Sequence, residues 1–276
     1  MSKHFTSQKP VIHLFDENPI LLFIDNSYPV VYYVHMKKAI LSAIIWFYIC
    51  ILTILVYLAV LLCVILFYPF DKKRKLAHMQ CFWWSDLVIA LNPYWKVQVK
   101  GRENIDKNRT YIIIANHQSL GDIVVAYQMK MQFKWVAKRV LFNIPFIGWS
   151  LSLTKHIKLE RGSFGSIKKV YREAAQWLRK GMSVFFFPEG TRSETTQIGD
   201  FHNGAFKLAI KERVPILPVI FEGTGTAIPR GSWIFGVKTF AKLKILPAIE
   251  TTSYHPADFA KLRDLAHSVL EGKNPD

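Results

Sequence analysis

A histidine and an aspartate five positions apart, His117 and Asp122, are the residues of this chain best suited to move a proton. A neutral imidazole beside a carboxylate is the minimal arrangement for taking a proton from a hydroxyl group. Residues five apart do not share a face of a regular helix, so the two can pair only if the chain turns between them. Gly121, which has no Cβ, permits that turn, and we predict that a helix begins only around Asp122. Taken alone, the pair is more typical of a polar strand end followed by a first-turn helix acid.

The residues before His117 indicate how its side chain would be positioned. Tyr111 to Ile114 are apolar and β-prone, which is typical of a strand buried on both faces. His117 would then follow the carboxyl end of that strand, where open α/β sheets bind their ligands.

A second polar group, F-P-E-G-T-R-S at 187–193, follows another apolar strand at 183–187. Gly190 allows a tight turn, Thr191 adds a hydroxyl, and the planar guanidinium of Arg192 can grip a phosphate with two hydrogen bonds. The alternative is a surface turn held by a Glu–Arg pair.

Two further basic residues, Lys138 and Arg161, lie in a strongly basic stretch. Residues 134–180 contain eleven Lys or Arg and two Glu. The solvated face of an amphipathic helix at 166–180 accounts for five of these cations. It does not account for Lys138 or for Arg161, which follows a short strand predicted at 155–159.

The composition indicates an anionic partner and a membrane. The 276 residues include 36 Lys and Arg against 20 Asp and Glu, a net charge of +16, and 51% are hydrophobic. Nucleic-acid binding does not require that much apolar surface, whereas a membrane does. The three cysteines predict neither a disulfide framework nor a metal site, which favours a reducing location facing the cytoplasm.

Residues 39–70 carry no charge and exceed the length that a bilayer core requires. Lys37 and Lys38 precede them and a basic cluster follows at 71–75, so both a tilted span and a helix held in one leaflet fit. The stronger second cluster favours a following domain that faces the cytoplasm and anionic lipid. An amphipathic, Trp-bearing stretch at 76–91 predicts an interfacial helix.

From Trp95 onward the pattern alternates between strands and helices, which predicts an α/β fold with a sheet covered by helices. We therefore divide the chain into a segment of unknown role (1–38), a membrane anchor with an interfacial helix (39–92) and a catalytic domain (93–276). The apolar stretch 141–153, interrupted by Pro145 and Gly148, could dip into the membrane or wall an apolar groove. Predicted strands cover 95–100, 111–115, 155–159, 183–187, 214–221 and 242–249, and predicted helices cover 122–131, 166–180, 204–212 and 256–270.

The blocks N-H-Q-S-L-G-D at 116–122 and F-P-E-G-T-R-S at 187–193 resemble the two signature blocks of the glycerolipid acyltransferase family. The pattern is most similar to that of the 1-acylglycerol-3-phosphate acyltransferases. Glu160-Arg161 and V-P-I-L-P-V at 214–219 fit two further blocks, and the resemblance covers roughly 95–250. Relatives often have Asp where this chain has Glu160, which leaves Arg161 in place.

The resemblance implies a mixed central sheet covered by helices and an acyl transfer from a thioester to a glycerol hydroxyl. His117 would be the general base and Asp122 the acid that orients it. The acceptor's own oxygen attacks, so Ser119 would not be a nucleophile, and amides after His117 are candidate donors to the oxyanion. The residues expected at the acceptor's phosphate are Lys138, Arg161, Glu189, Gly190, Thr191 and Arg192.

The expected acceptor is 1-acylglycerol 3-phosphate (lysophosphatidic acid), acylated at its sn-2 hydroxyl to give phosphatidic acid at a membrane. Acyl-CoA or an acyl-carrier protein would be the donor, and no metal, cofactor or nucleic acid is expected. The alternatives are a related enzyme acting on glycerol 3-phosphate or a lysophospholipid, and a non-catalytic, membrane-anchored lipid-binding protein.

Overall fold

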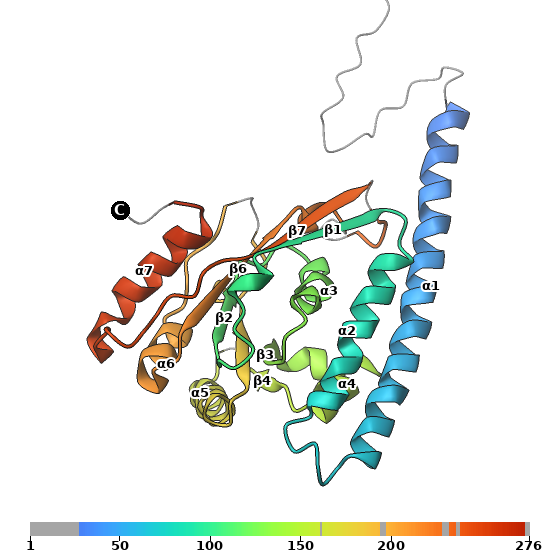
Figure 1. Ribbon diagram of the computed structural model, residues 1–276. Helices are drawn as coiled ribbons and strands as arrows, with labels where there is room; N and C mark the ends of the chain where they lie inside the picture. Colours follow the sequence, from blue (N-terminus) through green and yellow to red (C-terminus); the bar gives the residue numbers. More distant parts are fainter. Residues whose placement is uncertain (1–27, 161, 194–196, 228–231, 236–237, 274–276) are drawn as a thin grey trace, which may run out of the picture. The chain divides into compact units, whose positions relative to one another are not determined.

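The computed structural model describes residues 28–273 except 161, 194–196, 228–231 and 236–237. The chain forms two units, Met1–Lys37 and Lys38–Asp276. Of the first unit only the opening of the first helix is described, and everything below concerns the second. The elements, labelled in Figure 1, are α1 (Tyr28–Leu66), α2 (Lys75–Ala90), β1 (Trp95–Lys100), β2 (Ile112–Ala115), α3 (Gly121–Ala126), β3 (Phe133–Lys138), α4 (Ile147–Leu153), β4 (Ile157–Leu159), α5 (Phe164–Arg179), β5 (Ser183–Phe186), α6 (Gly204–Glu212), β6 (Ile216–Glu222), β7 (Thr239–Ile245) and α7 (Phe259–Leu270).

The seven strands form one mixed sheet in the order β1-β7-β6-β2-β5-β3-β4. The five strands from β6 to β4 run parallel, whereas β7 pairs antiparallel with β6 and β1 pairs parallel with β7. The predicted strand at 111–115 is therefore the middle strand, with Ile113 beside Phe185 on one side and Leu217 on the other. The mixed sheet predicted from the resemblance is confirmed.

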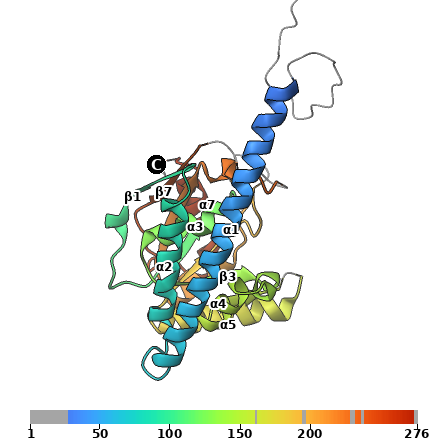
Figure 2. The same cartoon turned by 90° about the vertical axis from the view of Figure 1, so that its right-hand side faces the viewer.

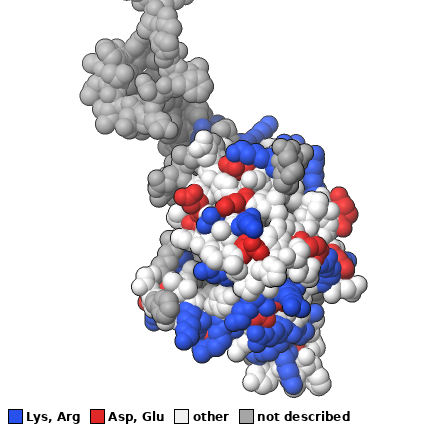
Figure 3. Space-filling model, turned by 90° about the vertical axis from the view of Figure 1, so that its left-hand side faces the viewer, with Lys and Arg blue, Asp and Glu red and all other residues white. Residues whose placement is uncertain are grey.

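Helices cover both faces of the sheet (Figure 1). Ile112 and Ile114 of β2 point into a core shared with α5, α6 and α7. Ile113, between them, points to the opposite core, which contains residues of α2 and α3. Alternation of side chains along a strand explains why one apolar run supplies both cores. The five cations expected on a solvated helix face are exposed, with Lys168, Lys169, Arg172 and Arg179 on α5 and Lys180 directly after it, and Figure 3 shows Lys and Arg gathered over that region.

The described part of the chain has one helix, α1, that is long and apolar enough to cross a membrane, over Met36–Leu66. It runs beside α2 (Figure 2). Four hydrogen bonds between described residues attach α1 to the domain, and they are Phe235 N to Ser42 Oγ (2.9 Å), Trp46 Nε1 to Trp233 O (2.7 Å), Tyr48 OH to Leu87 O (2.9 Å) and Trp84 Nε1 to Thr53 Oγ1 (3.1 Å). One side of α1 therefore packs on protein, while side chains such as Leu55 and Leu62 remain exposed. These features indicate a membrane anchor.

Several element boundaries differ from the sequence prediction. The helix expected over 122–131 is short, because α3 ends at Ala126 and continues only as a 3-10 turn at Tyr127–Met129. The last strand occupies Thr239–Ile245 rather than 242–249. Strand β3 was not predicted at all. Its sequence F-K-W-V-A-K places Lys134 between two aromatic residues, and a lysine is not expected at a buried strand position.

Lys134 is nevertheless fully buried. Its ammonium donates hydrogen bonds to Lys73 O (2.9 Å), in the link between α1 and α2, and to Thr154 O (2.7 Å), at the end of α4. It also lies 4.8 Å from the ring centre of Trp177 on α5. Burial lowers the pKa of this lysine to about 7, although nearby Asp71 raises it. The Lys134 side chain thus connects three segments, although burying its charge costs free energy of folding.

We expect this cost to appear as a pH-dependent stability. An unfolded lysine keeps its proton up to pH ~10.4, whereas Lys134 in the folded chain releases it near pH 7, so the unfolded state binds more protons between these values. Stability relative to Lys134→Met should rise with pH across that window, by on the order of 4 kcal/mol. Melting temperatures in detergent from pH 6 to 10 measure the difference.

The matched control is Lys100→Met, because the Lys100 side chain is exposed. Its difference from wild type should stay flat across the same range. A flat profile for Lys134→Met as well would contradict the burial of a cation at this position.

Candidate active site

The residue blocks singled out in the sequence follow strands that are neighbours in the sheet. His117 follows β2, the Glu189–Arg192 loop follows β5, and Lys138 is the last residue of β3. These strands are parallel and adjacent, so their carboxyl ends meet at one edge. Strand β4 pairs next to β3 in the same direction, but Arg161, two residues beyond its end, lies outside the described residues.

The chain turns after His117 so that Asp122 comes back to it. The Nδ1 atom of His117 lies 2.7 Å from Oδ2 of Asp122. Helix α3 begins at Gly121, preceded by a tight turn in which Asp122 N donates to Ser119 O (3.2 Å). The predicted turn and the predicted start of the helix are both present.

Gly121 contributes in a way that differs from the expectation. Its backbone is not in the left-handed region, so the turn does not depend on glycine's conformational freedom. A Cβ at this position would instead lie 3.0 Å from Ser119 Oγ and 3.3 Å from Trp95 Cη2. The missing side chain makes room for β1 and for the Ser119 hydroxyl.

The Asp122 carboxylate is fully buried and serves as the organising acceptor of the turn. Its Oδ2 atom accepts hydrogen bonds from the backbone amides of Gln118 (2.6 Å) and Ser119 (2.9 Å) as well as from His117. A carboxylate accepting from Nδ1 places the proton of a neutral imidazole on Nδ1, which leaves the Nε2 lone pair available as a base. The His117 side chain is 17% exposed, so a substrate can reach it.

Aromatic packing fixes the plane of the His117 ring. The ring stacks on Phe187 with centroids 4.1 Å apart and an interplanar angle of 19°. Phe187 in turn stacks on Trp135 of β3 at 5.7 Å. The imidazole is therefore held by a carboxylate at its edge and by an aromatic face.

The loop after β5 is joined to His117 through the backbone. Glu189 Oε1 accepts from His117 N (2.9 Å), and Ser193 N donates to His117 O (2.8 Å). The other oxygen of Glu189 accepts from Ser193 Oγ (2.6 Å) and from Gly199 N (3.0 Å). Glu189 thus holds the loop that carries Arg192 against the strand end that carries His117.

Ser119 and Asn116 are held in structural contacts. The Ser119 hydroxyl donates to Thr224 O (2.8 Å) and accepts from Gly121 N (2.9 Å). Asn116 exchanges two hydrogen bonds with the backbone of Phe221 in β6, at 2.9 and 2.8 Å, a role that sequence reasoning missed. The sequence feature that could have indicated this role is an asparagine directly after an apolar strand. The amides of Gln118, Ser119 and Gly121 all donate within the turn, so the idea that they bind an oxyanion is not favoured.

The cations have different surroundings. Arg192 is half-buried, and its guanidinium has no hydrogen bond or ion pair with any other described residue. Thr191 and Lys138 are exposed, and Gly190 adopts φ 70°, which explains the glycine in the turn. A half-buried cation beside the histidine loop is the arrangement expected for binding an anionic group.

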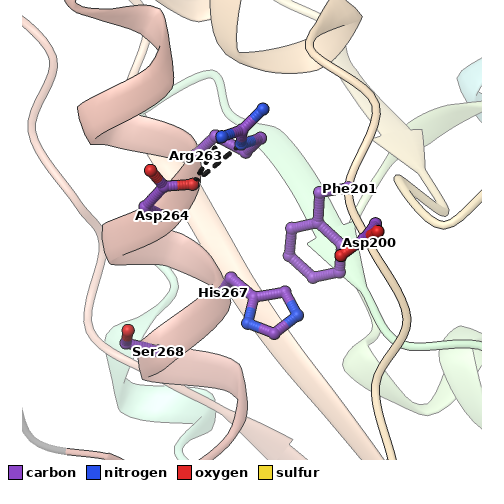
Figure 4. Close-up of a pocket in the computed structure, with 6 residues that line it drawn as sticks. All are labelled: Asp200, Phe201, Arg263, Asp264, His267 and Ser268. Carbon is purple, nitrogen blue, oxygen red and sulfur yellow. Dashed lines mark hydrogen bonds and ion pairs between the residues drawn. The ribbon is translucent and has the colours of Figure 1, made fainter.

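A hollow elsewhere on the surface lies between the chain at Asp200–Phe201 and α7 (Figure 4). The Phe201 and His267 rings make an edge-to-face contact there, with centroids 4.7 Å apart, and Arg263 pairs with Asp264. None of the predicted site residues lines this hollow. Among the described residues, no group of three or more His, Cys, Asp or Glu could hold a metal ion.

Comparison with known proteins agrees with the geometry. The family described as Acyltransferase matches residues 96–222, a range that contains all four blocks. A 1-acyl-sn-glycerol-3-phosphate acyltransferase of Pseudomonas aeruginosa is 31% identical over 186 residues, which are 67% of this chain and 70% of that protein. The chain belongs to the acyltransferase family. The resemblance predicted from the sequence blocks is therefore confirmed.

Other members of this acyltransferase family show the same similarity. A chloroplastic 1-acyl-sn-glycerol-3-phosphate acyltransferase of Arabidopsis thaliana is 37% identical over 170 residues, 61% of this chain. The match spans only 47% of that protein's length. The crystal structure of the 1-acyl-sn-glycerophosphate acyltransferase of Thermotoga maritima superposes with a TM-score of 0.61 at 26% identity, covering 82% of this chain and 95% of that one.

The Glu189 contacts predict a loss of stability on substitution. In Glu189→Gln, the amide nitrogen cannot accept the part-buried bonds that Ser193 and Gly199 donate, so these donors lose a charged acceptor. We expect a loss of about 2 kcal/mol, seen as a lower melting temperature. Glu160→Gln is the control, because the exposed pair of Glu160 with Arg139 should be worth no more than about 0.5 kcal/mol. Equal melting temperatures for the two variants would rule out the joining role of Glu189.

Proposed function

We propose that this protein is a membrane-bound O-acyltransferase. It transfers a fatty acyl group from a thioester to the sn-2 hydroxyl of 1-acylglycerol 3-phosphate and produces phosphatidic acid. The observation that carries the proposal is the pairing of His117 Nδ1 with Asp122 at 2.7 Å, on a turn hydrogen-bonded to the loop that bears Arg192. The names of the similar proteins from Pseudomonas and Arabidopsis support the choice of acceptor.

In the proposed reaction, His117 Nε2 takes the proton of the acceptor hydroxyl while that oxygen attacks the thioester carbonyl. The tetrahedral intermediate then expels the thiolate, which receives the proton from the imidazolium. Asp122 keeps Nδ1 protonated and stabilises the imidazolium by its negative charge. No enzyme nucleophile takes part, in agreement with the bonded Ser119 hydroxyl.

The phosphate of the acceptor would bind beside this pair. Arg192 supplies a planar guanidinium that has no hydrogen bond or ion pair with another described residue, Lys138 ends β3, and Arg161 follows β4 in the sequence. Gly190 and Thr191 form the turn that presents Arg192, and Glu189 holds that turn to His117. The anchor α1 keeps this edge of the sheet near its lipid substrate, with an acyl-CoA or an acyl-carrier protein as donor.

The rival functions are separable by assay. Glycerol 3-phosphate lacks the single acyl chain of lysophosphatidic acid, and other lysophospholipids differ from it in the headgroup, so one panel of acceptors ranks the three. A non-catalytic lipid-binding protein has no need for the buried carboxylate that orients His117, and it would show no turnover in that panel.

We expect His117→Ala to lower kcat by 10²–10⁴ or so, because general-base catalysis contributes that much. Asp122→Asn should also lower kcat, because an amide lacks the negative charge that keeps the proton of the imidazole on Nδ1. The assay measures acylation of lysophosphatidic acid by an acyl thioester in detergent. His267→Ala, on α7 and away from the predicted residues, is the control. Turnover of His117→Ala equal to that of the control would refute the mechanism.

We expect Arg192→Ala to raise the KM for the acceptor by roughly 10- to 100-fold, which corresponds to the loss of one charged hydrogen-bonding partner. The KM for the acyl donor should change little. Arg109→Ala is the matched control, because Arg109 is exposed and paired with Glu250. An unchanged acceptor KM in Arg192→Ala would exclude a phosphate role for this residue.

A further inference from the structure

Four large apolar side chains are exposed within ten residues between β3 and the end of α4. They are Val140 (62% exposed), Ile144 (40%), Ile147 (43%) and Trp149 (46%). Single exposed apolar residues are ordinary on protein surfaces, whereas a cluster of this kind marks an interaction surface. We call the segment 140–149 the apolar loop.

The backbone of the apolar loop is strained. Phe146 adopts φ 62° and ψ −50°, and Ile147 N donates to Pro145 O at 2.6 Å, which is the geometry of a γ-turn that non-glycine residues rarely adopt. Gly148 is equally constrained, because a Cβ there would lie 2.2 Å from Phe142 O. Strain of this kind persists only where surrounding contacts impose it, and it is common at functional positions.

The strained turn directs two rings onto the membrane anchor. Phe146 and Trp149 pack against Tyr57 of α1, with ring centroids 5.6 and 5.5 Å apart, and against each other at 5.0 Å. Beside Tyr57, the side chains of Leu55 and Leu58 on α1 are exposed. The apolar surface of α1 and that of the apolar loop are therefore joined through one aromatic cluster.

Basic residues border the apolar loop on the side of the sheet. Lys138 and Arg139 directly precede it and are exposed, and Lys158 lies 4.8 Å from the ring centre of Phe142. Apolar side chains bordered by cations are typical of segments that enter the headgroup region of anionic membranes. The same cations would repel the equivalent surface of a second copy of this chain.

We propose that the apolar loop is a second membrane-inserting element, which enters the headgroup region of an anionic bilayer beside α1. The loop and α1 then contact the membrane as one rigid surface, because Tyr57, Phe146 and Trp149 lock them together. The end of β3, which bears Lys138, is thereby held at the lipid surface. This inference concerns membrane contact alone and does not depend on catalysis.

Photo-crosslinking of the full, unmodified chain tests the proposal. The protein is reconstituted in vesicles of phosphatidylcholine and phosphatidylglycerol that contain a phosphatidylcholine with a diazirine close to the glycerol backbone. Trypsin then releases separate peptides for α1 (39–72), the apolar loop (140–155) and the start of α5 (162–168). We expect lipid adducts on the first two peptides and at least fivefold fewer on the third, which carries the exposed Ile167. Adducts on α1 without adducts on 140–155 would overturn the proposal.

Two further experiments distinguish insertion of the apolar loop into the membrane from other contacts of the loop. Excess lysophosphatidic acid should leave the adduct yield on 140–155 unchanged; a loss of adducts would identify the loop as the wall of a substrate groove instead. A lysine-reactive crosslinker that joins Lys155 to its copy blocks cleavage at this residue, so a dimer contact, with no lipid adduct, would appear as peptide 140–158 joined to itself. We expect no such product.

A matched pair of variants provides a second measure. Ile144→Asp places a charge on the apolar loop, and Ile167→Asp places one on a comparably exposed isoleucine of α5. Both side chains are exposed, so neither change should unfold the protein. Ile144→Asp should lower the adduct yield on its own peptide severalfold and leave that of α1 unchanged, while Ile167→Asp should alter neither. Equal yields in both variants would contradict insertion of the loop.

Discussion

The parallel pairing of β2 with β5 is the constraint on which the site depends. It brings together two strand ends that are about 70 residues apart in the chain, and Glu189 and Ser193, in the loop after β5, then bind the backbone of His117. The amide nitrogen and the carbonyl oxygen of His117 are both hydrogen-bonded to this loop. The backbone that carries the imidazole is therefore held in place. Asp122 and Phe187 then fix its rotation. The proposed general base and the loop proposed to bind phosphate are thereby positioned as one rigid unit.

The same unit has a buried acid at its centre. Asp122 is surrounded by the amides of its own turn, which stabilise its charge by donating hydrogen bonds. That arrangement uses up the nearest amides, so a donor for the oxyanion must come from elsewhere in the proposed reaction. Arg192, in contrast, has its hydrogen-bonding capacity unspent among the described residues. Hydrogen-bonded polar groups thus form the scaffold, whereas Arg192 belongs to the proposed binding surface.

Contacts with α1 extend this rigidity to the proposed membrane anchor. Tyr48, Thr53 and Tyr57 of α1 contact α2 and the apolar loop, and Lys134 ties the link after α1 to β3. A lysine buried in a strand is costly, yet it donates hydrogen bonds to the carbonyl groups of two separate segments. The anchor and the sheet edge therefore form a single body rather than two parts joined by a flexible link.

Much of the fold was predictable, because strands such as β2 and β5 are short apolar runs and α5 has a clear helical period. Strand β3 was missed because its burial of Lys134 depends on carbonyl groups of Lys73 and Thr154, which no local pattern reveals. The sequence by itself contains the H-x4-D spacing, the Arg-bearing block and the apolar N-terminal run. These features determined the family and the need for a turn before Asp122. Only the tertiary structure decided that Glu189 joins the two blocks, that Gly121 serves packing, and that a strained Phe146 meets Tyr57. These contacts link residues far apart in the chain, and their geometry follows from strand order and packing rather than from local spacing.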